Sequence, residues 1–266
     1  MVMVALLYAA PLFAQFDFPS LGGRGAAMGG VSLTLDDAMS AMSGSATLAY
    51  AERSAIAVGA RQDYLAEGMG YAMLGGIAKV GFGALTASMV HFGNSDYNEQ
   101  MLSLAYGVPL GKTVALGVML HYLHSGTSDP YYDPINAATF SLSVYARPSE
   151  DFGLGFKTFN PQSAFFDGNG NPHLPALMSV GVSYCLAEDL LAVAEVEKNM
   201  YQKATLRIGL EYSLQNMFLF RLGINTAPVI YSFGFGMRLS SFGFDVAGQI
   251  HNVLGFTPQL SMFYCF

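Results

Sequence analysis

Eight ionisable side chains in the second half of the chain are the residues whose types and spacing could do chemistry. They fall on alternate positions of consecutive apolar segments. If each segment is a β-strand, these positions all face inward: Glu195, Glu197, Arg207, Glu211, Arg221, Arg238, Asp245 and His251. Neighbouring strands lie about 4.8 Å apart, so such residues can pair across a sheet. Their signs are mixed, whereas a selective pore uses a ring of one sign. The pattern favours a closed ion-pair network; the alternative is a polar track that guides a solute.

Other reactive residue types lack the spacing that chemistry requires. The run Asp-Gly-Asn-Gly-Asn at 167–171 begins like a calcium loop, but Pro172 and Met178 stand where glycine and glutamate are needed. The five histidines have no metal-ligand spacing, and no nucleophile elbow occurs. Cys185 and Cys265 belong to distant segments, which argues against a disulfide. Because these motifs are missing, we expect no enzyme activity, cofactor or metal, and the net charge of −7 argues against a nucleic-acid partner.

Composition identifies the class of protein. Charged residues make up 12% of the chain and hydrophobic residues 52%, whereas about 25% of a soluble domain is charged. Beyond the N-terminus, no apolar run reaches the roughly 18–20 residues that a transmembrane helix needs. Only helices and closed barrels satisfy every backbone hydrogen bond in lipid. The composition therefore predicts a transmembrane β-barrel, and a soluble β-sandwich is the alternative.

Alternation with a period of two residues locates the strands. In residues 218–225, for example, Phe218, Phe220 and Leu222 alternate with Leu219, Arg221 and Gly223. The predicted strands are 54–64, 69–74, 80–92, 100–106, 114–124, 139–146, 152–159, 179–186, 190–198, 205–212, 218–225, 231–239, 242–251 and 259–266. Tight turns, including one at 75–79, alternate with longer loops, as in outer-membrane barrels. We predict an all-β, antiparallel, up-and-down barrel of about 14 strands.

The two ends of the chain differ from the barrel segments. Residues 1–14 are apolar and end at Ala14, which predicts a cleaved signal peptide. Residues 15–52 are rich in small residues and do not alternate, so we expect a small plug inside the barrel of residues 53–266; the alternative is a flexible periplasmic arm. The chain ends on an alternating set that resembles the insertion signal of bacterial outer-membrane barrels: Leu260, Met262, Tyr264 and Phe266.

Several motifs resemble a known family. The small-residue run at 22–30 precedes Asp36-Asp37-Ala38, and residues 224–228, 232–236 and 251–258 resemble closing hairpins. Together they resemble the PorV/PorQ group of the FadL-like outer-membrane proteins of Bacteroidota. The group's Asn-Pro pair is missing at 43–49. The resemblance implies a fourteen-stranded barrel with an N-terminal plug in the bacterial outer membrane. Its partners would be membrane lipid (lipopolysaccharide and phospholipid), the barrel-assembly machinery and other outer-membrane or surface proteins.

The resemblance implies two functions. PorV/PorQ proteins are partners of protein machines, so we first expect a non-enzymatic scaffold subunit of a type IX-like secretion or outer-membrane protein assembly complex. The alternative is a FadL-like channel for hydrophobic small molecules, which predicts an apolar pocket and a lateral gap between strands. A lipase-like barrel enzyme would instead need convergent polar groups at one rim. A scaffold would present aromatic contact residues, although these could equally form an interfacial girdle: Tyr131, Tyr132, Phe165, Phe166 and Phe256.

Overall fold

A computed structural model describes residues 19–20, 22–43, 46–162, 174–200 and 202–266. The expected signal peptide and the aromatic residues Phe165 and Phe166 lie outside these residues.

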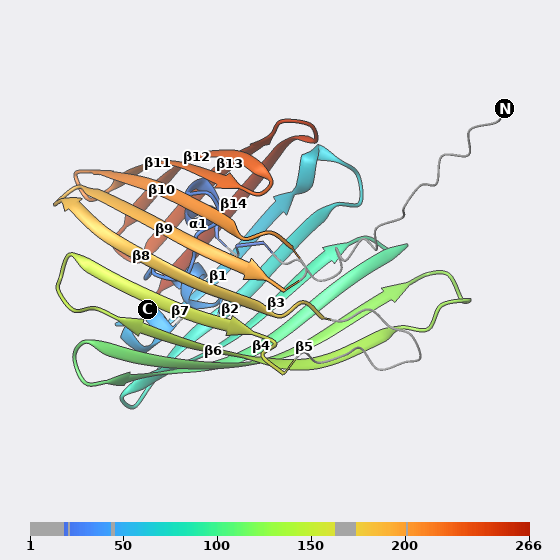
Figure 1. The fold of residues 1–266 in the computed structure, drawn as a ribbon, viewed down its shortest axis with the longest axis horizontal. Coiled ribbons are helices and arrows are strands. Elements are labelled where there is room, and N and C mark those ends of the chain that lie inside the picture. The colour runs from blue at the N-terminus through green and yellow to red at the C-terminus, as the bar shows by residue number, and fades with distance from the viewer. Residues whose placement is uncertain (1–18, 21, 44–45, 163–173, 201) are drawn as a thin grey trace.

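Fourteen antiparallel strands close into a barrel, as the sequence predicts (Figure 1). Each strand pairs with its sequence neighbours, and the first strand closes the barrel by pairing with the last, from Ala55↔Cys265 to Arg61↔Gln259. The strands are β1 (Ala55–Gln62), β2 (Gly70–Val80), β3 (Gly83–Gly93), β4 (Tyr97–Leu110), β5 (Val114–Thr127), β6 (Ile135–Ala146), β7 (Phe152–Phe159), β8 (Leu177–Ala187), β9 (Leu190–Asn199), β10 (Thr205–Leu214), β11 (Phe218–Thr226), β12 (Val229–Leu239), β13 (Phe242–His251) and β14 (Gly255–Cys265).

One predicted turn is wrong. Residues 75–79 belong to β2, and the chain reverses at Gly81 and Phe82 instead. Gly81 has a φ of 59°, a conformation that glycine adopts without steric cost. Gly75 and Gly76 suggest a turn in the sequence, but Gly75 faces the barrel interior, where a side chain would collide with Met42. A glycine within a strand often marks such a close approach.

The outer surface of the barrel is apolar. Outward positions carry exposed hydrophobic residues such as Leu104, Leu120 and Leu222, with exposed fractions of 63%, 61% and 64%. The intervening positions are buried, as the alternating pattern of β4 shows. Such a band of outward apolar side chains is what a transmembrane barrel presents to lipid. Within the described residues, no helix is both long and apolar enough to cross a membrane.

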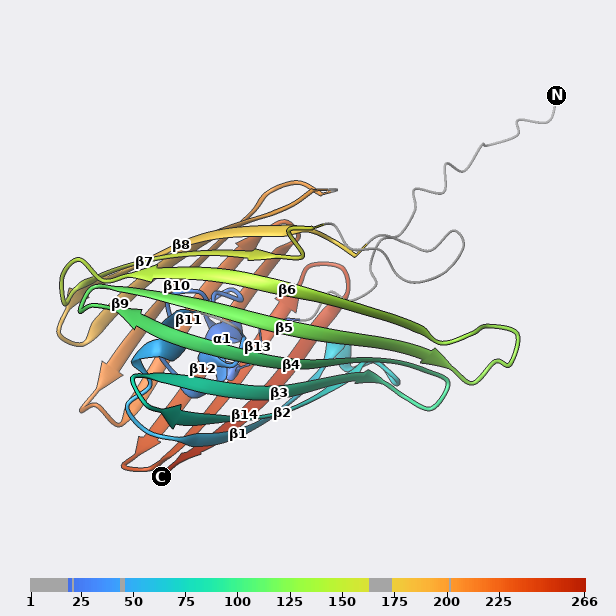
Figure 2. The same cartoon turned by 90° about the horizontal axis from the view of Figure 1, so that it is seen from below.

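The described residues between 19 and 52, called here the N-terminal segment, lie inside the barrel (Figures 1 and 2). They form α1 (Gly23–Ala27), α2 (Ala38–Ala41) and the 3-10 helix η1 (Ala46–Tyr50). A second 3-10 helix, η2 (Asp63–Leu65), follows β1. Asp37 caps α2 by accepting hydrogen bonds from the backbone N–H groups of Met39 and Ser40. Ala26, Ala27 and Met28 are completely buried, so the segment is packed against the inner wall.

Candidate functional site: the barrel lumen

Glycines on the inner wall make room for the N-terminal segment. A Cβ atom built on Gly223 would lie 2.2 Å from the backbone nitrogen of Gly29, and one on Gly209 would lie 2.4 Å from Cβ of Met28. No real Cβ atom tolerates such distances, so these positions require glycine. Six strands carry an inward glycine that the segment approaches in this way: Gly75, Gly107, Gly155, Gly209, Gly223 and Gly234. The wall and the segment are therefore complementary in shape.

Arg221 is the centre of an ion-pair network in the lumen. Its side chain is fully buried, with Nε donating to Glu211 at 2.6 Å and Nη1 donating to Asp245 at 2.7 Å. Arg238 donates to Asp245 from Nη1 at 2.9 Å and from Nη2 at 3.1 Å. Buried charges are tolerated only when they are paired and hydrogen-bonded, and here each has such partners.

Arg24 of α1 extends this network to the N-terminal segment. Its Nε and Nη2 atoms donate to the Glu211 carboxylate at 2.9 and 2.6 Å, and Nη1 donates to Asp36 at 2.9 Å. Burial acts to lower the pKa of the Arg24 guanidinium, but the attraction of nearby carboxylates, led by Glu211, outweighs it and raises this pKa above its ordinary value. Arg24 therefore stays protonated and joins the segment to the wall.

A second group of ions fixes the next part of the segment. Arg207 pairs with Glu195 at 3.1 Å and with Glu197 at 2.7 Å. Glu195 also accepts hydrogen bonds from the backbone N–H groups of Ser32 and Leu33, at 3.0 and 3.1 Å. The wall thus recognises the backbone of the segment as well as its side chains.

The structure brings seven of the eight predicted lumenal residues into these ion pairs. His251 is placed elsewhere: its Nδ1 accepts hydrogen bonds from the backbone N–H groups of Val253 and Leu254 in the turn after β13. Sequence reasoning missed the ion pairs of Arg24 with Asp36 and Asp37. It also missed the contact of Lys157, which donates a hydrogen bond to the backbone oxygen of Ser43. The available signal for Arg24 was a single cation within a run of small residues.

The other half of the lumen contains an apolar cluster that is rich in methionine. One cluster of buried residues joins the N-terminal segment to the inner face of β1 to β6. Its methionines are Met39, Met42, Met73, Met101 and Met119, each at most 9% exposed. The same cluster also includes Val90 near the end of β3, Leu123 near the end of β5 and Ala137 near the start of β6. Buried polar side chains, among them Ser88, Glu99 and His121, lie on the same inner face, so we use the name apolar wall only for the methionine-rich cluster on β1 to β6, and charged wall for the ion-paired face on β9 to β13.

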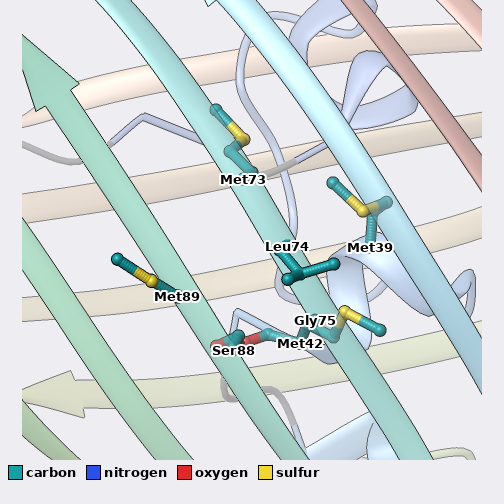
Figure 3. Close-up of a pocket in the computed structure, with 7 residues that line it drawn as sticks. All are labelled: Met39, Met42, Met73, Leu74, Gly75, Ser88 and Met89. Atoms are coloured by element: carbon teal, nitrogen blue, oxygen red, sulfur yellow. Dashed lines mark hydrogen bonds between the residues drawn. The ribbon is translucent and has the colours of Figure 1, made fainter.

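A small pocket lies in the apolar wall at Gly75 (Figure 3). It has a volume of about 10 Å³ and is lined by Met39, Met42, Met73, Leu74, Gly75, Ser88 and Met89. Leu74 and Met89 are outward and exposed, whereas Met42 is buried inside. The pairing of β2 with β3 continues without a break from Tyr71↔Phe92 to Val80↔Gly83. The wall here has no gap between strands, so the paired backbones of β2 and β3 separate the lumen from the outer surface.

The remaining predicted contact residues lie on the outer surface. Tyr131 and Tyr132 follow β5 at the tip of a projecting hairpin, are 86% and 63% exposed, and pack edge to face. Phe256 does not lie in a loop as predicted; it is the second residue of β14, because β14 begins earlier than the sequence indicated. The four residues of the insertion signal also face outward: Leu260, Met262, Tyr264 and Phe266.

Comparison with known proteins identifies the fold. The sequence matches no protein-family model and no curated protein sequence. Solved structures that resemble it include the Pseudomonas putida toluene transporter TodX, with a TM-score of 0.70 and 13% identity over 94% of this chain and 98% of that chain. A Pseudomonas aeruginosa FadL homologue gives 0.70 and 12%, covering 92% and 98%. The Ralstonia pickettii toluene transporter TbuX gives 0.65 and 13%, covering 94% and 98%.

The chain has the fold of the FadL-type channels. At these identities the likeness concerns the architecture, and the resemblance to the PorV/PorQ group remains a prediction.

Proposed function

We propose that the protein is a non-enzymatic channel of the bacterial outer membrane that passes small hydrophobic molecules. The observation that carries this proposal is the apolar, methionine-rich wall of the lumen on β1 to β6. Unbranched methionine side chains change shape easily and accommodate apolar ligands of different outline. The names of the structurally similar toluene transporters point to the same class of solute.

The N-terminal segment defines how such a channel would work. It packs against both walls of the lumen, held by Arg24 on the charged wall and by buried methionines on the apolar wall. A solute would therefore pass between the segment and the apolar wall, where Met39 and Met42 of the segment lie in one cluster with Met73 of β2. In this proposal, movement of these three side chains opens the path.

A polar substitution on the apolar wall tests this function. Met101→Gln keeps the length of the side chain but buries an amide without a partner, which costs about 1–3 kcal/mol. We expect uptake of toluene by cells that carry the variant to fall by about tenfold, the change that corresponds to about 1.4 kcal/mol. Met101→Leu is the matched control and should retain uptake, because it preserves an apolar side chain of similar volume.

The proposal is contradicted if Met101→Gln, Met101→Leu and the unmodified protein all support equal uptake while being present in the membrane in equal amounts. It is also contradicted if cells without the protein take up toluene as quickly as cells that contain it.

A scaffold role in a secretion or assembly complex is the second candidate, and the exposed tyrosine pair favours it. Tyr131 and Tyr132 lie in the loop between β5 and β6, a hairpin that projects from the barrel in Figure 2, and both are exposed. Large exposed aromatic residues commonly anchor protein interfaces.

Gentle purification from the native membrane tests the scaffold role. We expect companion proteins in stoichiometric amounts with the unmodified chain, and their loss from a Tyr131→Ser, Tyr132→Ser variant. Met101→Gln is the control, since it alters only the lumen and should keep the companions. Purification of the unmodified chain without companions would remove this candidate.

A further inference from the structure

An apolar hollow lies on the outer face of the barrel, away from the lumen. Its volume is about 810 Å³, and its lining comes mainly from outward residues of β10 to β14. Pockets that bind small molecules measure roughly 300–1,000 Å³. Leu210 and Leu222, which pair across β10 and β11, form part of the lining and are 44% and 64% exposed.

Small residues and aromatic pairs shape this outer hollow. Gly234, Ala247 and Gly248 are among its lining residues. The rings of Phe233 and Phe256 stack with centroids 6.3 Å apart, and a Cβ on Gly248 would lie within 2.8 Å of both. On the inner side of the same wall, Ala27 of α1 approaches Gly234 so closely that a Cβ there would lie 2.5 Å away. The small residues therefore form the floor of the outer hollow, and the aromatic side chains form its sides.

The charge and position of the outer hollow restrict its occupant. Arg221 is its one charged lining residue, and the guanidinium points into the lumen, where it binds Glu211 and Asp245. The outer hollow is also continuous with the apolar outer band, since Leu222 and Phe220 belong to both. An occupant must therefore be uncharged and must come from the apolar layer that contacts this band.

We propose that the outer hollow is a binding site for the acyl chains of a bilayer lipid. Acyl chains are flexible, uncharged and present wherever the outer band meets the membrane. An acyl chain in the bilayer is already out of water, so its preference for the outer hollow comes from closer van der Waals packing against the lining side chains. This inference depends on the proposed membrane location but not on the proposed transport, so either can fail alone.

The absence of tryptophan from the chain allows a direct test. Leu222→Trp places a single indole in the outer hollow, and Leu142→Trp places one on the outer face of β6, outside it. The two positions are matched in depth, because Leu222 lies four residues after Phe218 and Leu142 lies four residues before Ala146, at the same end of the barrel. Leu210→Trp provides a second reporter in the outer hollow, in case one variant folds poorly.

The purified variants would be titrated in detergent with a phospholipid whose acyl chains are brominated, since bromine quenches indole fluorescence on contact. We expect both reporters in the outer hollow to be half quenched at a lipid concentration about tenfold lower than the Leu142→Trp control, a difference of about 1.4 kcal/mol. Equal quenching at all three positions would overturn the proposal. Weaker quenching in the outer hollow than at Leu142→Trp would also overturn it, because a second copy or another protein would then cover the site.

Discussion

Arg221→Met is expected to lower the free energy of unfolding by about 3 kcal/mol, because Glu211 and Asp245 each lose a buried hydrogen-bonded cation and keep only Arg24 and Arg238 as partners. Arg221 is fully buried and bonds to both Glu211 and Asp245, so both carboxylates lose a hydrogen-bonded cation. The measurement is equilibrium unfolding in denaturant, with the folded barrel in lipid or detergent.

Arg207→Met is the matched control for this prediction. Arg207 also pairs with two carboxylates, but its side chain is 20% exposed, so water can replace part of what is lost. We expect a loss of about 1 kcal/mol, in line with partly exposed ion pairs. If the two variants lose equal stability, Arg221 is not the centre of the lumenal network.

Gly223→Ala is expected to release the N-terminal segment from the wall. The added methyl group would lie 2.2 Å from the backbone nitrogen of Gly29 and 2.3 Å from the backbone carbon of Met28, and neither chain can yield without a shift of the backbone. Forcing atoms into a filled interior costs about 1–3 kcal/mol, and more where the backbone must move.

Trypsin reports this release, because Arg24 is a cleavage site within the segment and its side chain is only 12% exposed. The unmodified protein should resist cleavage at Arg24. Gly223→Ala should be cleaved at least about tenfold faster, which corresponds to a decrease of about 1.4 kcal/mol in the free energy needed to open the segment. Gly76→Ala is the control, since a Cβ there meets its nearest neighbour at an ordinary 3.6 Å. Resistance of both variants would show that the segment does not depend on the glycines.

The strands could be predicted because one side of the wall contacts lipid and the other contacts the lumen. The signal was clear in β10 to β13, where inward residues such as Arg207, Arg221 and Asp245 are charged and contrast with outward phenylalanine and leucine. It was weak in β1 to β5, where the inward residues include Met73 and Met101. An apolar lumenal wall removes the contrast on which the period of two depends. Small inward residues such as Ala84, Thr86 and Ser103 add little contrast of their own, which explains the weaker signal in this half.

The contacts of the N-terminal segment could not be predicted from spacing. Arg24 and its partner Glu211 are separated by 187 positions, and no local pattern connects them. The inward glycines did carry a signal, because Gly209, Gly223 and Gly234 fall on the inward parity of consecutive strands. Interpreted as places of close approach, they would have indicated that something packs against the wall at this level.

The central claim, that the barrel passes small hydrophobic molecules, is tested most directly by flux through the isolated protein. Planar bilayers with a lipopolysaccharide leaflet, which resists apolar solutes, would receive the purified barrel, and the passage of toluene and of a small sugar would be followed. We expect the barrel to speed the passage of toluene and to leave the passage of the sugar unchanged, since the apolar wall favours uncharged, poorly hydrated solutes. Faster passage of the sugar, or no acceleration of toluene, would contradict it.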